Sequence, residues 1–225
     1  MDDLRGIERV ALLREPVRRH LYEHVRRAGA PVGRDEAARA VGISRAMAAF
    51  HLDRLAEAGL LEVEYRRLSG RSGRGAGRPA KLYRSTEIRA EASVPPSRYV
   101  LAGDLLLRAV REREPDETAD QALRRTAAAH GKEIAATLRT AKRSRSPVVR
   151  MRAALEDLGY GPVDRDATVI LRNCPFHELV ERHRDDMCGL NLAFLRGVAE
   201  GLDAGQISVR SHDEPGTCCV AVEAP

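Results

Sequence analysis

Residues 32–61 read VGRDEAARAVGISRAMAAFHLDRLAEAGLL, and this stretch decides the fold of the first part of the chain. Its apolar residues recur at helical spacing in two short blocks, one on each side of Gly42-Ile43-Ser44. Gly42 permits the left-handed backbone of a tight turn, and Ser44 is suited to cap the second helix. Two helices joined by so short a turn predict a helix-turn-helix, whose second helix is built to enter a major groove.

The residues that follow predict a β-hairpin with a cationic tip. Residues 61–65 alternate like a strand after the helix-ending Gly59, and residues 81–84 read as the return strand. Between residues 62 and 84 the only acidic residues are Glu62 and Glu64, whereas the basic residues are Arg66, Arg67, Arg71, Arg74, Arg78, Lys81 and Arg84. A hairpin of this kind after a helix-turn-helix is interpreted as a wing that contacts DNA, with a solvated loop as the alternative.

Candidate DNA contacts follow from this arrangement, because the start of the second helix normally reaches base edges. They are Ser44, Arg45, Ala46, Phe50, His51 and Arg54 in the second helix, and Arg71, Arg74, Arg78 and Lys81 in the wing. Two alternatives stay open. Arg45 either binds a guanine edge or only holds phosphate, and Phe50 either touches a thymine methyl or belongs to the apolar face with Met47, Leu52 and Leu55.

These motifs also resemble a known family. Gly42-Ile43-Ser44, Phe50-His51-Leu52, Gly59-Leu60 and the segment from Gly77-Arg78-Pro79 to Tyr83 are similar to the winged-helix domain of ArsR-type bacterial repressors. The resemblance implies a repressor that reads double-stranded DNA at a palindromic operator as a homodimer.

Composition limits the remaining possibilities. The chain has 225 residues and a net charge of +5, which fits one or two domains and suits a nucleic-acid partner. No apolar run reaches the length of a membrane span, and Met1-Asp2-Asp3 opens no secretory signal, so we expect a cytoplasmic protein. In a reducing cytosol the four cysteines point to metal or redox chemistry rather than disulfides.

The expected fold class is α+β, in three parts. Residues 1–88 form the winged helix-turn-helix, including a first helix over 6–27 in which Pro16 begins a new helical segment. Residues 89–146 contain a linker around Pro95-Pro96 and alanine-rich helices, one of them capped by Thr118 or Asp120, that are expected to dimerise the molecule. Residues 147–225 form a cysteine-bearing sensor domain, with a buried strand over 167–171 and two further strands near the end. The sequence leaves open which helices pair.

All four cysteines, Cys174, Cys188, Cys218 and Cys219, lie in the last part. Cys174 and His177 place two metal donors three residues apart beside a proline, a spacing common in ligand pairs. We expect a helix break at Gly189, which would put Cys188 near a helix N-terminus and lower its thiol pKa. Cys218 and Cys219 lie in a predicted strand and point to opposite faces, so one of them is expected to bind directly. The second of them, His177 or His183 remains open as the fourth ligand, and small buried hydrophobes are the alternative for all four cysteines.

The resemblance extends to these residues. The segment 171–177, Cys188-Gly189-Leu190-Asn191-Leu192, residues 197–202 and Cys218-Cys219-Val220 are similar to the iron–sulfur-sensing repressors of the Suf cluster-assembly operon. The resemblance implies an iron–sulfur cluster, of the [4Fe-4S] type, held by Cys174, Cys188 and one of Cys218 or Cys219, whose loss changes operator affinity. Cyanobacterial members carry four well-separated cysteines, whereas two of the four are adjacent here.

Two other functions compete with this interpretation. The first keeps the DNA-binding part and gives the last part a structural zinc site or a pocket for a small organic effector. The second is an enzyme with Cys174 as nucleophile and His177 as base. We expect no enzyme, because the sequence carries no glycine motif for an oxyanion hole.

Overall fold

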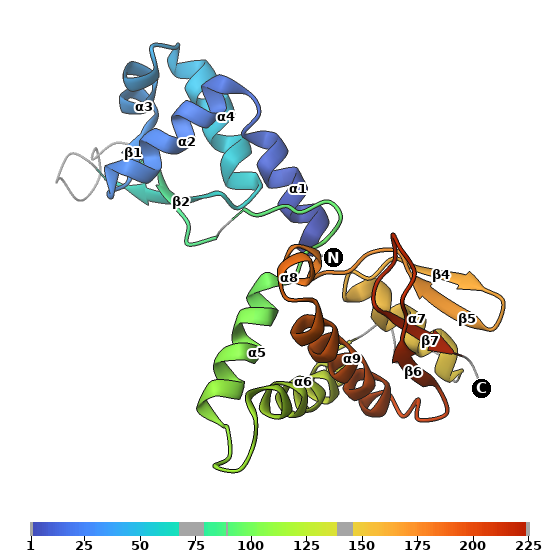
Figure 1. Cartoon of the computed structure of the whole chain (residues 1–225). Helices are drawn as coiled ribbons and strands as arrows, with labels where there is room; N and C mark the ends of the chain where they lie inside the picture. Colours follow the sequence, from blue (N-terminus) through green and yellow to red (C-terminus); the bar gives the residue numbers. More distant parts are fainter. Residues whose placement is uncertain (1, 68–78, 89, 139–145, 224–225) are drawn as a thin grey trace. The chain divides into compact units, whose positions relative to one another are not determined.

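The computed structural model describes residues 2–67, 79–88, 90–138 and 146–223, and the chain divides into two compact units (Figure 1). The N-terminal unit spans Met1–Ser93 and the C-terminal unit spans Val94–Pro225. Each unit has its own hydrophobic core. The segment 89–146, expected to be a separate linker and dimerisation part, therefore contributes its helices to the core of the C-terminal unit.

The N-terminal unit is a winged helix-turn-helix. Its elements are α1 (Asp2–Leu12), α2 (Pro16–Ala28), β1 (Val32–Gly33), α3 (Arg34–Val41), α4 (Arg45–Glu57), β2 (Leu61–Arg66) and β3 (Ala80–Ser85). The predicted first helix is two helices, and Pro16 opens the second, with the Glu15 side chain accepting hydrogen bonds from the first free N–H groups. Leu21, Leu52 and Leu55 from α2 and α4 are fully buried in the core.

The strands of this unit form a three-stranded antiparallel sheet in the order β1-β3-β2. The hairpin β2–β3 confirms the predicted wing strands, with Val63 opposite Tyr83. Strand β1 was not predicted, because two residues are too few to show an alternating pattern; Val32 pairs with Tyr83 across the sheet.

The C-terminal unit combines helices with a second sheet. Its elements are α5 (Tyr99–Arg111), α6 (Ala119–Ala135), α7 (Pro147–Asp157), β4 (Pro162–Arg165), β5 (Thr168–Leu171), α8 (His177–Arg182), α9 (Arg184–Gly201), β6 (Ser208–Ser211) and β7 (Val220–Glu223). The sheet is antiparallel with the order β4-β5-β7-β6. Thr118 caps α6 in a reciprocal capping box with Gln121, which decides between the two predicted caps.

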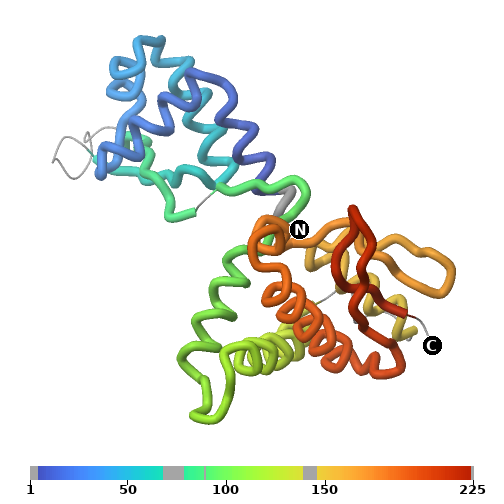
Figure 2. The backbone as a smooth tube through the Cα atoms, in the orientation of Figure 1, coloured from blue at the N-terminus to red at the C-terminus, as the bar shows by residue number. Residues whose placement is uncertain are grey.

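Helices α6 and α9 run side by side at the centre of this unit (Figure 2). Glycine makes this close approach possible: a Cβ atom on Gly197 would lie 2.0 Å from the carbonyl oxygen of Ala128, and one on Gly131 would lie 2.1 Å from that of Phe194. Among the described residues, no helix is long and apolar enough to cross a membrane.

The helix that carries Cys188 breaks at a different place from the predicted one. The break lies at His183, between α8 and α9, and Gly189 is in the interior of α9. The prediction of a break at Gly189 is therefore wrong. The Arg124 guanidinium packs directly over this glycine, with its atoms 2.4–2.6 Å from a Cβ built at position 189.

Candidate nucleic-acid interface and thiol site

The turn between α3 and α4 has the predicted geometry. Gly42 adopts a left-handed backbone with φ 74°, and its N–H donates to the Ala38 carbonyl. The Ser44 hydroxyl accepts a hydrogen bond from the Met47 N–H at 3.2 Å and so caps α4. This turn fixes the direction in which the reading helix α4 leaves the domain.

The first half of α4 presents exposed side chains. Ser44, Arg45 and Ala46 are exposed, and Met47 and Phe50 are 47% and 60% exposed. This exposure decides between the two alternatives for Phe50: neither Phe50 nor Met47 belongs to the apolar core face, which Ala48 and Leu52 fill. An exposed aromatic ring on a reading helix is suited to contact with a thymine methyl group.

Arg45 lies beside a cationic groove. Its Nε atom is 2.8 Å from an oxygen of Asp35, but both side chains are largely exposed, so this pair is weak and exchanges readily for phosphate or a base. The groove, of about 840 Å³, runs from the start of α3 and α4 to the wing strands. Its cationic lining residues are Arg34, Arg39, Arg45, Arg66 and Lys81.

The two remaining candidates on α4 differ in exposure. Arg54 is exposed, and its guanidinium is 3.7 Å from the Glu57 carboxylate. The His51 side chain is only 12% exposed; its Nδ1 accepts from Arg18 Nε at 3.4 Å and lies 3.8 Å from Glu15. His51 thus connects α4 to the start of α2, and the structure does not place it on the exposed face expected of a base-reading residue.

A polar network that the sequence did not reveal joins α4 to the wing. Asp53 accepts hydrogen bonds from Lys81 Nζ and from the Tyr83 hydroxyl, both at 2.6 Å, and from Arg34 at 3.0 Å. Burial raises the pKa of Asp53, but the hydrogen bonds from Lys81 and Tyr83 and the nearby cations outweigh it and leave the pKa below its ordinary value. Burial and the bond to Asp53 raise the pKa of Tyr83 to about 12.

The wing candidates divide into two groups. Lys81 lies in β3, where its ammonium group is engaged with Asp53. Arg71, Arg74 and Arg78 lie outside the described residues, so their predicted contacts with DNA stay predictions.

In the C-terminal unit the four cysteines come together from three segments. Cys174 follows β5, Cys188 lies in the second turn of α9, and Cys218 and Cys219 precede β7. Their side chains are neighbours in a row, which we call the thiol row: Cys174 is next to Cys218, Cys218 is next to Cys219, and Cys219 is next to Cys188. None of the four is in a disulfide.

Along the row, thiols with a lowered pKa alternate with thiols with a raised pKa. The hydrogen bond from Cys218 lowers the pKa of Cys174 and lowers that of Cys219 to about 6. The pKa of Cys218 itself is raised, because its proton is shared with both neighbours. Burial, with the contact to Cys219, raises the pKa of Cys188 to about 12, so the predicted lowering at this residue is wrong.

Two further sequence expectations need correction here. Cys218 and Cys219 lie in irregular backbone before β7 begins at Val220, so the alternation of a strand does not apply and both thiols join the row. The His177 side chain is 70% exposed and its Nε2 lies 3.3 Å from Glu181, outside the row. His183 is exposed at the α8–α9 junction.

The thiol row does not have the shape of a single-ion site. Within the described ranges, no three or more His, Cys, Asp or Glu side chains converge as one metal ion would require.

Two buried polar residues that sequence reasoning missed lie against the row. Asn191 is fully buried, and its Nδ2 donates to the Cys218 sulfur at 3.2 Å. The buried Tyr160 hydroxyl donates to Asn191 Oδ1. An asparagine inside the apolar run Leu190–Leu195 was the available signal, because a buried amide needs hydrogen-bond partners.

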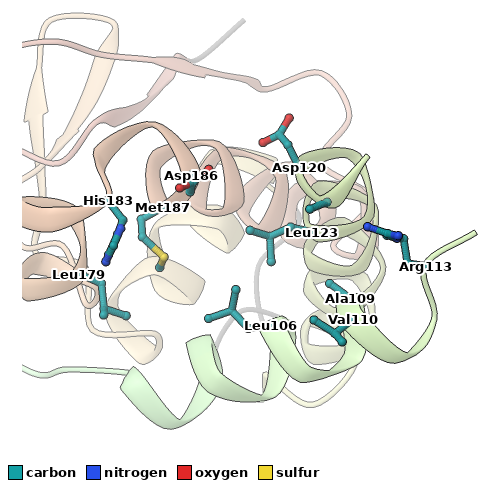
Figure 3. A pocket seen from close by; sticks show the side chains of 11 residues that line it. Leu106, Ala109, Val110, Arg113, Asp120, Leu123, Leu179, His183, Asp186 and Met187 are labelled. Atoms are coloured by element: carbon teal, nitrogen blue, oxygen red, sulfur yellow. The ribbon is translucent and has the colours of Figure 1, made fainter. Parts of the chain in front are cut away.

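The same unit contains an apolar pocket of about 850 Å³, shown in Figure 3. Leu106, Leu123 and Met187 line its interior, and Arg113, His183 and Asp186 are among its polar residues (Figure 3). The pocket is formed by α5, α6, α8 and the start of α9. None of the four cysteines is among the residues that line it.

Comparison with known proteins agrees with the N-terminal geometry. Residues 12–64 match a family of helix-turn-helix domains. Searches of curated proteins and of solved structures found no match. Together with the wing hairpin, this match defines a winged-helix domain of the class found in DNA-binding transcriptional regulators, which bind double-stranded DNA.

Proposed function

We propose that the protein is a homodimeric transcriptional repressor that reads a palindromic operator and holds an iron–sulfur cluster on its C-terminal cysteines. The single observation that carries the sensing part is the thiol row, because three distant segments bring all four cysteines of the chain together. A bound cluster supplies one-electron and oxygen-sensitive chemistry.

The proposed cluster rests on donor type, because all four side chains of the row are cysteines and iron–sulfur clusters are held by cysteine thiolates. Four cysteines can also hold a structural zinc ion, so metal analysis has to separate the two. Cys174, Cys188, Cys218 and Cys219 are the proposed ligands.

The dimer has a candidate surface on α5. Val100, Leu107 and Val110 are 84%, 65% and 77% exposed, and their spacing of seven and three residues puts them on one face of the helix. Large exposed apolar groups on one face commonly mark an interface. A second copy that packs α5 against α5 covers this face in both chains.

Sensing then requires a difference in affinity. A cluster alters operator binding only if it binds one arrangement of the dimer more tightly than the other, and the operator selects between the same two arrangements. We propose that the C-terminal unit supplies these two arrangements through α9, which carries both Cys188 and the packing against α6.

DNA binding is tested by selecting duplexes from a random pool with the full chain at low salt and measuring affinity for the selected site. Arg45→Ala should weaken binding by about tenfold, the loss of one good base or phosphate contact. Arg182→Ala, which removes an exposed arginine of the C-terminal unit, is the matched control and should bind like the wild type. Absence of any selected or non-selected binding would refute the DNA-binding part.

Dimerisation is tested by sedimentation. Leu107→Glu should convert the dimer to a monomer, because it buries a charge in an apolar interface. Val149→Glu, at an exposed valine of α7, is the control and should stay dimeric. A wild-type monomer at all concentrations, or a Leu107→Glu dimer of unchanged affinity, would exclude this surface.

The cluster is tested by iron, sulfide and zinc content per chain after purification without oxygen. Iron with a matching amount of sulfide supports the cluster, and zinc alone supports a structural site. Removal of the cluster by a chelator should then change the affinity for the selected operator. If the affinity for the operator did not change, the cluster would not regulate DNA binding.

The apolar pocket favours a second candidate function. A pocket of about 850 Å³ is large enough for a small organic ligand and is lined mainly by apolar side chains with a few polar ones. In this alternative an amphipathic organic effector, not a cluster, regulates DNA binding. Leu106→Trp, at a half-exposed lining residue of α5, fills the pocket and should abolish the response to such an effector while leaving iron uptake intact.

A further inference from the structure

Asn191 stands out among the residues around the thiol row. Apart from the tyrosines, it and Thr126 are the two buried polar or charged residues among those described. It lies in α9 one turn after Cys188, between Leu190 and Leu192 in an otherwise apolar segment. A fully buried amide costs free energy unless its polar atoms find partners, so this position requires an explanation.

Both ends of the Asn191 amide have partners of different kinds. The oxygen accepts from the Tyr160 hydroxyl, and this bond fixes which end of the amide faces the sulfurs. The nitrogen therefore points an N–H group at the sulfur of Cys218, 3.2 Å away. A neutral thiol is a weak acceptor, whereas an anionic sulfur accepts a stronger, charge-assisted hydrogen bond.

This arrangement suits anionic sulfur better than neutral thiol. Tyr160 is itself buried, at 1% exposure, so the pair Tyr160–Asn191 is a rigid support behind the two adjacent cysteines. Residues in the second layer around a metal site typically orient the ligands in this way, and their loss weakens metal binding about 10–100-fold.

We propose that Asn191 is a positioning residue whose amide N–H group holds the sulfur of Cys218 in its metal-bound form, with Tyr160 fixing the orientation of the amide. This inference rests on the proposed cluster site. It extends that proposal to two residues that are not ligands themselves.

The test uses the full chain, reconstituted without oxygen with ferrous iron and sulfide. The measured quantity is the rate at which a ferrous chelator removes the iron. Asn191→Asp keeps an oxygen that accepts from Tyr160 and removes the N–H donors, so it separates the sulfur contact from the tyrosine contact. We expect iron loss about 10–100-fold faster than in the wild type.

Two further variants complete the test. Tyr160→Phe removes only the hydroxyl and frees the amide to turn, so we expect a smaller increase of several fold. Thr126→Val is the matched control, because Thr126 is buried in α6 and its hydroxyl has no hydrogen-bond partner. It should release iron at the wild-type rate, and far-ultraviolet circular dichroism of the metal-free proteins reports whether each variant folds.

Three outcomes would overturn the proposed role of Asn191. Folded Asn191→Asp with wild-type iron loss overturns the proposal, as does an equal acceleration in Thr126→Val, which would indicate general core damage. If Asn191→Asp does not fold, Tyr160→Phe takes its place, and an unchanged rate in that variant overturns the proposal. A wild-type chain that takes up no iron and sulfide refutes the cluster site itself, and the role of Asn191 with it.

Discussion

The two units present their functional side chains in opposite ways. On the reading helix of the N-terminal unit, Arg45 and Phe50 are exposed, and the core lies beneath them. In the C-terminal unit Cys218 and Asn191 are buried and form part of the core. A surface that binds DNA can change without loss of the fold, whereas a buried thiol site couples ligand binding to packing and stability. The predictions below test this contrast.

The largest expected effect is the loss of bound metal when a cysteine of the row is changed. Cys218→Ser should reduce iron per chain to background, because Cys218 contacts both Cys174 and Cys219. His177→Ala should keep the wild-type iron content, because this side chain is exposed and outside the row. Metal analysis after anaerobic purification measures both. Equal losses in the two variants would mean that the exposed histidine is a ligand and that the site is not confined to the buried row.

The next effect concerns the close packing in the C-terminal unit. Gly197→Ala should destabilise it by about 3 kcal/mol, because the new Cβ would lie 2.0 Å from the Ala128 carbonyl oxygen in α6. Gly205→Ala, in the turn before β6 with no atom within 4 Å of the new Cβ, should stabilise the protein by about 0.4–1 kcal/mol. Urea unfolding followed by circular dichroism gives both values. A tolerated Gly197→Ala would show that α6 and α9 can separate without loss of stability.

A smaller effect is expected for the network that joins α4 to the wing. Asp53→Ala should cost about 2 kcal/mol, since it removes hydrogen bonds to Lys81, Tyr83 and Arg34. Glu62→Ala, which removes an exposed ion pair with Arg84, should change the stability by less than about 0.5 kcal/mol. Both are measured by urea unfolding at neutral pH.

The same network predicts a dependence on pH. The folded state lowers the pKa of Asp53, so its stabilising contribution is present above the pKa of the unfolded carboxyl group and is lost as the pH falls through the folded-state pKa. The difference in stability between the wild type and Asp53→Ala should therefore shrink on acidification. A difference that grows at low pH would contradict the assigned contacts.

The sequence predicts the N-terminal unit better than the C-terminal one, for a physical reason. The turn at Gly42, the cap at Ser44 and the wing strands depend on residues close together in the chain, and all three were predicted correctly. The exposure of single side chains was harder to predict from the sequence. The spacing of Phe50 fits a core face, but the core of this unit is filled by Leu52 and Leu55.

In the C-terminal unit the chemistry depends on contacts between distant segments. The sequence identifies the cysteines, but it cannot tell that Cys218 and Cys219 both point into one row, because the start of β7 decides whether they alternate. Asn191 was missed because its partners Tyr160 and Cys218 lie 31 and 27 residues away.

The smallest effect on stability, and the sharpest test of the exposed reading helix, is expected for Phe50. Phe50→Ala should change the free energy of unfolding by less than about 0.5 kcal/mol, because the ring is 60% exposed, but should weaken binding to the selected operator about tenfold. Leu52→Ala, two residues further along α4 and fully buried, should instead cost about 2–5 kcal/mol. If Phe50→Ala destabilised the unit as strongly as Leu52→Ala, the ring would belong to the core, and the contrast between an exposed DNA-binding face and a buried thiol site would no longer hold.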